Sequence, residues 1–171
     1  MKAVPARHKI VTFDALLAER QAWRSLGLKV VWTNGCFDLL HAGHVYNLEY
    51  AAAQGDRLVV GLNSDASVRR LKGPTRPLVP QDERAVLIAA LACVDAVCFF
   101  DDDTPVNALA RLQPDIHCKG DEYAPPHGKP IPELPVVLGY GGEIRFIPLV
   151  PVLSTTDLVR RITEIAPVRG A

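Results

Sequence analysis

Five short apolar segments rich in β-branched residues are spread along the chain. They cover 29–33, 57–62, 96–100, 115–119 and 143–149. Several are apolar on both faces, which is typical of strands buried inside a parallel sheet. Apolar residues recur at helical spacing between and after these segments, over 12–26, 45–54, 82–93, 104–112 and 155–165. Because strand and helix alternate, the pattern predicts an α/β fold with a five-stranded parallel sheet and right-handed crossovers.

The stretch 123–135 interrupts this alternation. It contains five prolines, which exclude a regular helix or a central strand across it. A loop of this length is more often a lid or a binding loop than filler, although a plain surface excursion stays open. Since the sequence shows no repeat and no linker, we expect one domain over 1–171, with a core at about 28–165 behind a helix at 12–26.

Composition narrows the class of partner. Nineteen Lys and Arg balance nineteen Asp and Glu, which gives no reason to expect nucleic acid or a membrane surface as a partner. Every apolar run falls well short of the roughly 20 residues that cross a bilayer. The cysteines form no CxxC pair, which favours reduced thiols in a cytoplasmic protein; they are Cys36, Cys93, Cys98 and Cys118.

The strongest chemical signal is the stretch TNGCFDLLHAGH at 33–44, which leads from the first strand into a helix. Ligands of open α/β sheets bind at the carboxyl ends of strands, so its place fits a binding site. Gly43 lets a phosphate approach the first helical turn, whose free N–H groups attract anions. His41 and His44 share one side of that turn and can donate to phosphate oxygens. A third metal ligand is missing beside them, so we expect no protein-held metal.

Basic residues after the second strand form a second group. Lys72 and Arg76 flank a Gly-Pro pair, which predicts a turn. Arg84 lies in the first turn of its helix, where the macrodipole disfavours a cation. An anionic ligand would explain this position, and so would compensation by Asp82 or Glu83.

Two further stretches place polar groups at helix starts. Ser154 and Asp157 have the spacing of a capping box, and the hydroxyls of this helix start can also hold a phosphate. The acidic run 101–103 precedes Thr104-Pro105, so we expect it to cap a helix rather than to bind a metal. Lys119 stands at the carboxyl end of the fourth strand, on the ligand side of the sheet.

The residues His41-Ala42-Gly43-His44 match the HxGH motif of the nucleotidyltransferase superfamily. Over roughly 13–165 the chain resembles the bacterial heptose 1-phosphate adenylyltransferases. The segments that carry the resemblance are TNGCFDLLHAGH, GDRLVVGLNSD, LKGPTRP, ERAVLIAALACVD and STTDLVRRI. The HxGH motif alone indicates only the superfamily. The segment LKGPTRP and the STT segment, residues 154–156, narrow the resemblance to the heptose enzymes.

This resemblance implies a Rossmann-like three-layer α/β/α fold of the nucleotidyltransferase type. It also implies transfer of AMP from ATP, with Mg²⁺, to a phosphorylated sugar, the nearest match being D-glycero-β-D-manno-heptose 1-phosphate. The products would be an ADP-sugar and pyrophosphate, in a pathway for lipopolysaccharide. The resemblance further implies a homodimer.

The resemblance also assigns roles to residues. It implies catalytic roles for His41, His44 and Lys72. Nucleotide contacts are implied for Thr33, Asn34, Gly35, Phe37, Gly43, His44, Arg84, Lys119, Ser154, Thr155 and Thr156. Contacts to the acceptor fall on Asp38, Arg76 and Asp121. At 119–123 this chain reads KGDEY where the heptose enzymes usually read KGGDY, so its acceptor site departs from their pattern.

Three other functions compete with adenylyl transfer to a sugar phosphate. A cytidylyltransferase acting on a polyol or alcohol phosphate, such as glycerol 3-phosphate, shares the fold and the HxGH motif. Those glycerol-phosphate enzymes commonly carry an arginine shortly before the STT segment, and 148–153 contains none. A nucleotide-binding module without turnover is less consistent with intact histidines and Lys72. A dehydrogenase is excluded because no GxGxxG follows the first strand.

Overall fold

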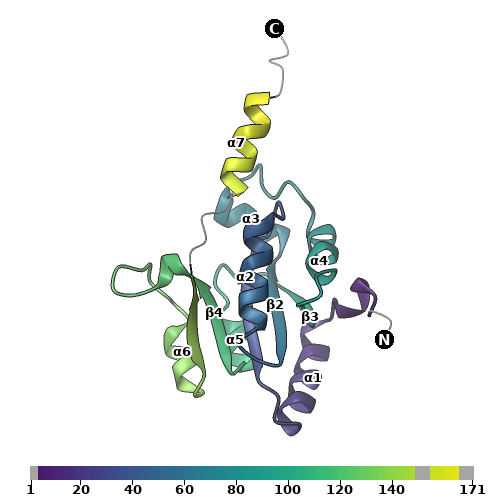
Figure 1. The fold of residues 1–171 in the computed structure, drawn as a ribbon, viewed down its shortest axis with the longest axis vertical. Coiled ribbons are helices and arrows are strands. Elements are labelled where there is room, and N and C mark those ends of the chain that lie inside the picture. The colour runs from purple at the N-terminus through teal and green to yellow at the C-terminus, as the bar shows by residue number, and fades with distance from the viewer. Residues whose placement is uncertain (1–3, 149–154, 166–171) are drawn as a thin grey trace.

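A five-stranded parallel sheet lies at the centre of the fold (Figure 1). The computed structural model describes residues 4–148 and 155–165, with 155–157 as backbone only. The strands are β1 (Val30–Gly35), β2 (Arg57–Asn63), β3 (Ala96–Phe100), β4 (Ile116–Gly120) and β5 (Glu143–Ile147). Their order is β3-β2-β1-β4-β5. The chain therefore starts in the middle strand, builds outward to one edge and then crosses to the other side.

Helices cover both faces of the sheet. They are α1 (Phe13–Ser25), α2 (Ala42–Ala52), α3 (Asp65–Lys72), α4 (Gln81–Ala89), α5 (Val106–Leu112), α6 (Leu134–Gly139) and α7 (Thr155–Ile165), with 3₁₀ turns η1 (Ala6–Lys9) and η2 (Asp121–Tyr123). One apolar cluster joins α2 and α4 to the sheet, and a second joins α1, α5 and α6 to the opposite face. The predicted three-layer α/β/α fold is thereby confirmed.

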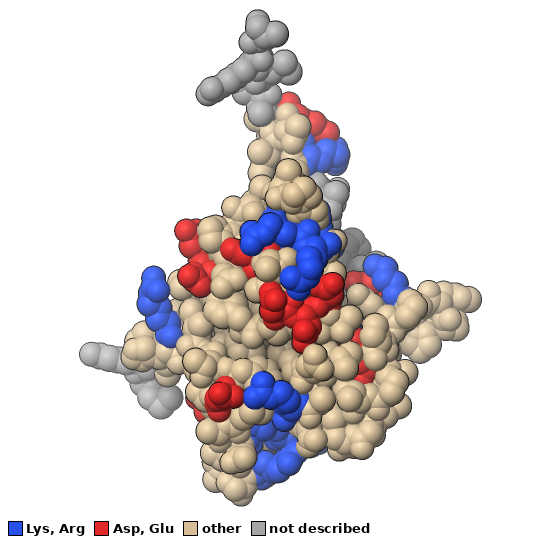
Figure 2. Space-filling model, turned by 180° about the vertical axis from the view of Figure 1, so that it is seen from behind, with Lys and Arg blue, Asp and Glu red and all other residues tan. Residues whose placement is uncertain are grey.

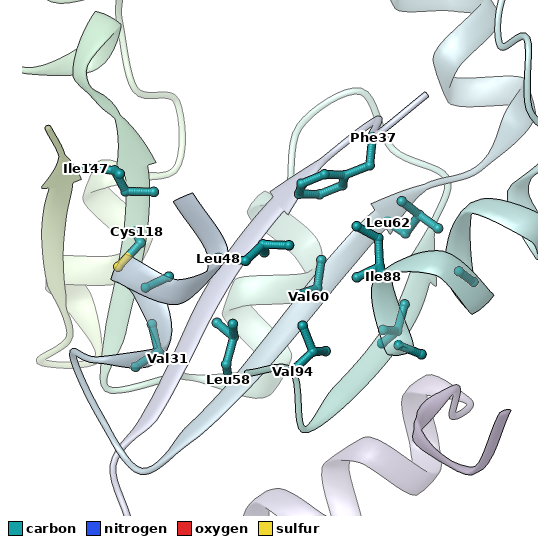
Figure 3. Close-up of a cluster of buried hydrophobic side chains, with 14 of the residues drawn as sticks. Val31, Phe37, Leu48, Leu58, Val60, Leu62, Ile88, Val94, Cys118 and Ile147 are labelled. Atoms are coloured by element: carbon teal, nitrogen blue, oxygen red, sulfur yellow. The ribbon is translucent and has the colours of Figure 1, made fainter. Parts of the chain in front are cut away.

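The two clusters follow from alternation along the buried strands. In β1, Val31 faces the α2 and α4 side, while its neighbours Val30 and Trp32 face the α1 and α5 side. Figure 3 shows Leu48 of α2 and Ile88 of α4 beside strand residues of the first cluster. All five are fully buried. Because both faces are covered, the strands are apolar throughout, as the sequence pattern indicated.

The elements agree with the predicted ranges, with informative exceptions. Each strand begins and ends within two residues of its predicted range. Helix α2 begins at Ala42, earlier than the predicted start at 45, so His44 belongs to its first turn. No residue range was predicted for α3 or α6. Both are short, so few residues are available to show a helical period.

The prediction that the acidic run 101–103 caps a helix is wrong. Helix α5 begins at Val106 without a side-chain cap. Instead, Asp101 accepts a hydrogen bond from the Ser64 hydroxyl, and Asp103 forms an ion pair with Arg70 at 2.7 Å. These carboxylates therefore hold α3 against the loop that follows β3.

The surface shows no extended area of one charge on the face drawn in Figure 2. Basic and acidic side chains lie beside one another there, and most of that face carries no formal charge. Over the described residues, no helix has the length and apolar character needed to cross a bilayer.

The contact between Trp32 and Gly61 generates a test of the sheet packing. A Cβ atom at Gly61 would lie 2.1 Å from the Trp32 ring, which is fully buried. Because overpacking a core costs about 1–3 kcal/mol, Gly61→Ala should lower the free energy of unfolding by that amount in urea. Gly139→Ala is the matched control, since nothing lies within 4 Å of its added Cβ. Equal stability of the two variants would contradict this packing.

Candidate active site

A cavity of about 760 Å³ opens at the carboxyl ends of β1 and β4. The strand order changes direction between these two strands, and such a switch point is where open α/β sheets bind ligands. The cavity wall combines the end of β1, the first turn of α2, the end of α3 and the segment after β4. It brings together these predicted site residues: Thr33, Asn34, Gly35, Phe37, Asp38, His44, Lys72, Arg76 and Lys119.

The remaining predicted residues lie elsewhere. Gly43 and His41 belong to the start of α2 beside the cavity but do not line it. Ser154 lies outside the described residues. Thr155 and Thr156 begin α7, and their side chains lie outside the described part. The structure therefore leaves the STT segment as a prediction.

The two histidines form a stacked pair at the N-terminus of α2. Their ring centroids lie 3.8 Å apart with 24° between the planes. His41 is the N-cap residue and makes no side-chain cap hydrogen bond, which leaves its ring free to stack on His44. The N–H groups of this first turn lack intrahelical acceptors, so the pair stands where a helix favours an anion.

Phe37 supports the pair from the other side. Its ring meets the His44 ring edge-on, with centroids 5.2 Å apart. Phe37 has a positive φ of 46°, which is rare for a bulky residue and is tolerated where surrounding structure enforces it. A Cβ atom at Gly35 would approach the Phe37 ring to 3.1 Å. The glycine at the end of β1 therefore gives the ring its place.

Burial keeps both histidines neutral. It lowers the pKa of His44 to about 4, with a further contribution from the neighbouring His41. It also lowers the pKa of His41. A backbone hydrogen bond with Leu39 acts in the opposite direction on the pKa of His44. The Nδ1 atom of His41 is buried and has no hydrogen-bond partner among the described residues.

Lys72 supplies a cation at the cavity wall. It is the last residue of α3, where the helix dipole favours a positive charge. Within the described part of the chain, no carboxylate lies within ion-pair distance of its ammonium group. Its charge is thus available to an anion in the cavity.

Asp38 has its oxygens directed at the chain itself. Its Oδ1 accepts hydrogen bonds from the backbone N–H groups of Leu78 and Val79, at 2.7 and 3.0 Å. Its Oδ2 lies 2.8 Å from Nε of Arg76. The side chain is nearly fully buried. Asp38 thereby fixes the segment after Lys72 against the end of β1, and it places Arg76 at the cavity.

Arg84 lies beneath the cavity rather than in its wall. Its fully buried guanidinium donates to the carbonyl groups of Cys36, Asn63 and Val79 and pairs with Asp65 at 2.7 Å. The partner is therefore Asp65, not the neighbouring acidic residues of its own helix that the sequence suggested. All three nitrogens of this cation donate to the protein, so Arg84 holds the elements of the cavity together and does not contact a ligand directly.

The end of β4 brings Lys119 to the cavity, next to residues that the sequence did not single out. Asp121 is exposed at the start of η2 and does not line the cavity, whereas the adjacent Glu122 does. Lys129 and Glu133 also line the cavity from the proline-rich stretch. No periodic or motif signal marks them, because a stretch without regular structure gives no indication of which side chains turn inward.

The part of the chain that builds this cavity matches a known protein family. Residues 32–161 match the family model described as cytidylyltransferase-like. That match spans most of the chain and includes every cavity residue named above. The chain belongs to the cytidylyltransferase-like family. It is a nucleotidyltransferase, and the stacked histidines lie within the matched residues.

Relatives extend this assignment. The chain is 52% identical over 158 residues to a protein of Trichlorobacter lovleyi named bifunctional protein HldE, covering 91% of this chain and 31% of the relative. A protein of the same name from Azorhizobium caulinodans is 52% identical over 152 residues, covering 89% of this chain and 31% of the relative. The chain thus spans about a third of the length of these curated relatives.

A solved structure gives the same fold. The lipopolysaccharide core biosynthesis protein of Thermoplasma volcanium superposes with a TM-score of 0.61 at 28% identity, covering 72% of this chain and 99% of that one. A pantoate-β-alanine ligase of Francisella tularensis superposes with a TM-score of 0.57 at 13% identity, covering 91% and 78%. The second likeness concerns the fold alone.

The neutral state of His44 in this nucleotidyltransferase is testable by titration. We expect NMR to show its ring protonating near pH 4 in the free protein, and at higher pH when a non-hydrolysable ATP analogue is bound, because phosphate charge favours the imidazolium. Since the unfolded chain protonates first, near 6.5, the free energy of unfolding should fall as pH drops from 6.5 to about 4, and less so in His44→Gln. Protonation near pH 6.5 in the free protein would contradict this environment.

Proposed function

We propose that this nucleotidyltransferase is an adenylyltransferase, which moves AMP from ATP to the phosphate of a sugar 1-phosphate. The expected acceptor is D-glycero-β-D-manno-heptose 1-phosphate. The observation that carries the proposal is the neutral, stacked pair His41 and His44 at a helix N-terminus, with Lys72 at the wall of the same cavity. The HxGH, LKGPTRP and STT motifs and the relatives named HldE support the choice of nucleotide and acceptor.

The reaction needs positioning and charge stabilisation more than a strong base. An oxygen of the acceptor phosphate is already anionic near pH 7, and it would attack the α-phosphorus of ATP in line. The bond from this phosphorus to the bridging oxygen of the β-phosphate would break, releasing pyrophosphate and leaving the ADP-sugar. Charge grows on the bridging and non-bridging oxygens in the transition state, so prepositioned donors accelerate the step.

The cavity residues fit these roles. Each neutral imidazole has one N–H to donate, and His44 lines the cavity where a phosphate can reach the first turn of α2. Lys72 would neutralise charge on the departing phosphates. It would not have to give up an ion pair with a carboxylate of the described residues to do so. Thr33 is held by a hydrogen bond from its hydroxyl to the Cys118 carbonyl, at 3.2 Å, so the floor of the cavity is fixed before substrate binds.

Mg²⁺ is expected to enter with ATP. In the described residues, no group of three or more His, Cys, Asp or Glu side chains is placed to hold a metal ion. This donor set fits a metal that is carried on the phosphates of the nucleotide. When bound there, the ion would offset phosphate charge, while the side chains of this protein orient the nucleotide and acceptor.

Pyrophosphate release tests the substrates directly. The protein is incubated with Mg²⁺, each of the four nucleoside triphosphates, and heptose 1-phosphate or glycerol 3-phosphate as acceptor. We expect release only with ATP and the sugar 1-phosphate, with the ADP-sugar identified by mass. Release only with CTP and glycerol 3-phosphate would overturn adenylyl transfer. Silence from folded, nucleotide-binding protein would overturn adenylyl transfer to heptose 1-phosphate.

The role of His44 is tested by substitution. His44→Ala should lower kcat by about 10²–10³-fold, the usual effect of removing one transition-state donor, and leave the fold intact by circular dichroism. His8→Ala, in the exposed turn η1, is the matched control and should retain full activity. A folded His44→Ala protein with unchanged kcat would contradict the mechanism.

A further inference from the structure

The proline-rich segment between β4 and α6, residues 121–133, has a defined place beside the cavity. Its backbone folds back on itself: the N–H of Lys129 donates to the carbonyl of Glu122 at 2.8 Å. A Cβ atom at Gly128 would lie 2.3 Å from the Tyr123 carbonyl, so the two arms of the loop are in close contact. Six residues of this segment line the cavity, namely Glu122, Tyr123, Lys129, Pro130, Pro132 and Glu133.

Glu133 holds the end of this segment to the sheet. Its side chain is 1% exposed, and Oε1 lies 2.6 Å from the ammonium group of Lys119 on β4. The same oxygen lies 3.6 Å from Nε2 of His117, which is fully buried. The Glu133 carbonyl also accepts the N–H of Val137 in the first turn of α6. A buried carboxylate is strongly destabilising without a partner, so the ion pair fixes the loop and the strand together.

The positive charge of Lys119 is thereby engaged from two sides. One side meets the Glu133 carboxylate, and the other lies over the Tyr123 ring, 3.9 Å from its centroid. Burial lowers the pKa of His117 to about 3, so that ring is neutral and adds no second positive charge. The charges of Lys119 and Glu133 therefore balance each other. Lys119 attracts an incoming phosphate more weakly than its position in the sequence suggests.

Lys129 supplies the charge that Lys119 does not. Its ammonium lies 5.7 Å from the same Tyr123 ring and lines the cavity. Across residues 4–148 and the described side chains of α7, no carboxylate lies within ion-pair distance of it. Lys72 and Lys129 thus provide uncompensated positive charge from two different walls of the cavity, α3 and the proline-rich segment.

We propose that Glu133 is a positioning residue, which holds segment 121–133 against β4 through Lys119 so that Lys129 meets the phosphate of the acceptor. The proposal rests on the proposed function in requiring a phosphorylated acceptor. It gives the proline-rich segment a role in acceptor binding, while the nucleotide is bound by the histidine and Lys72 side of the cavity.

Glu133→Gln tests the positioning step, because it keeps the shape of the side chain and removes the charge. Hydrogen exchange followed by mass spectrometry should show the amides of 121–133 exchanging about tenfold faster or more, since removing one partner of a buried pair weakens the element it holds. The KM for the sugar 1-phosphate should rise by about tenfold, with the KM for ATP within about twofold of the wild-type value. The control Glu143→Gln, an exposed carboxylate at the start of β5, should change neither quantity.

Lys129→Met tests the same wall without touching a buried group. It should raise the KM for the sugar 1-phosphate by about tenfold and leave the KM for ATP unchanged, because the lost interaction is to the acceptor alone. Lys29→Met, an exposed lysine at the opposite end of the sheet, is the matched control.

The outcomes separate this proposal from the proposed function. Unchanged exchange in a folded Glu133→Gln protein overturns the positioning role, whatever the substrate. Equal rises in both KM values, or no rise in Lys129→Met, overturn the acceptor role. If wild-type protein transfers no AMP to any sugar phosphate, the proposed function fails. In that case the acceptor role of segment 121–133 is still testable by hydrogen exchange. D-mannose 1-phosphate and glycerol 3-phosphate are each added alone to the protein. If neither slows the exchange of the amides of 121–133, the acceptor role is overturned.

Discussion

One buried cation, the guanidinium of Arg84, joins the parts from which the cavity is built. A charge without solvent is stable only when its donors meet acceptors, and those acceptors come from the loop after β1, the end of β2, the first turn of α3 and the segment before α4. Asp38 extends the same arrangement by binding the backbone of that segment and Arg76. The position of Lys72, at the end of α3, depends on these contacts.

The charges at the cavity are arranged in two ways. Some cations are balanced by buried carboxylates, as Arg76 is by Asp38 and Lys119 is by Glu133. These pairs set the shape of the walls. Lys72 and Lys129 lack such partners among the described residues, and the stacked histidines are neutral. A phosphorylated ligand therefore meets donors and two separate positive charges, without a dense cationic cluster that would repel itself in the free protein.

The strands and the strand-to-helix junction of this protein can be predicted from its sequence, because the patterns that indicate them lie within short stretches of the chain. Strands buried on both faces are continuous apolar runs, so their ranges agree with the structure to within two residues. The glycines and histidines of 33–44 lie at a strand-to-helix junction, and the parallel sheet places that junction at the switch point. No residue range was predicted for helices α3 and α6, because both are short and tertiary contacts hold them in place.

The sequence by itself determined the fold class, the family and the junction that carries His41 and His44. Only the tertiary structure decided which charges are free. Arg84, Asp38 and Lys119 were all predicted as ligand contacts. Yet each binds a residue distant in sequence, namely Cys36, Leu78 and Glu133, which lie 48, 40 and 14 residues away. Glu133 stood in a stretch without any pattern. Ion pairs and buried hydrogen bonds form between residues distant in sequence, so no local pattern encodes them; they exist only once the sheet has brought the ends of its strands together.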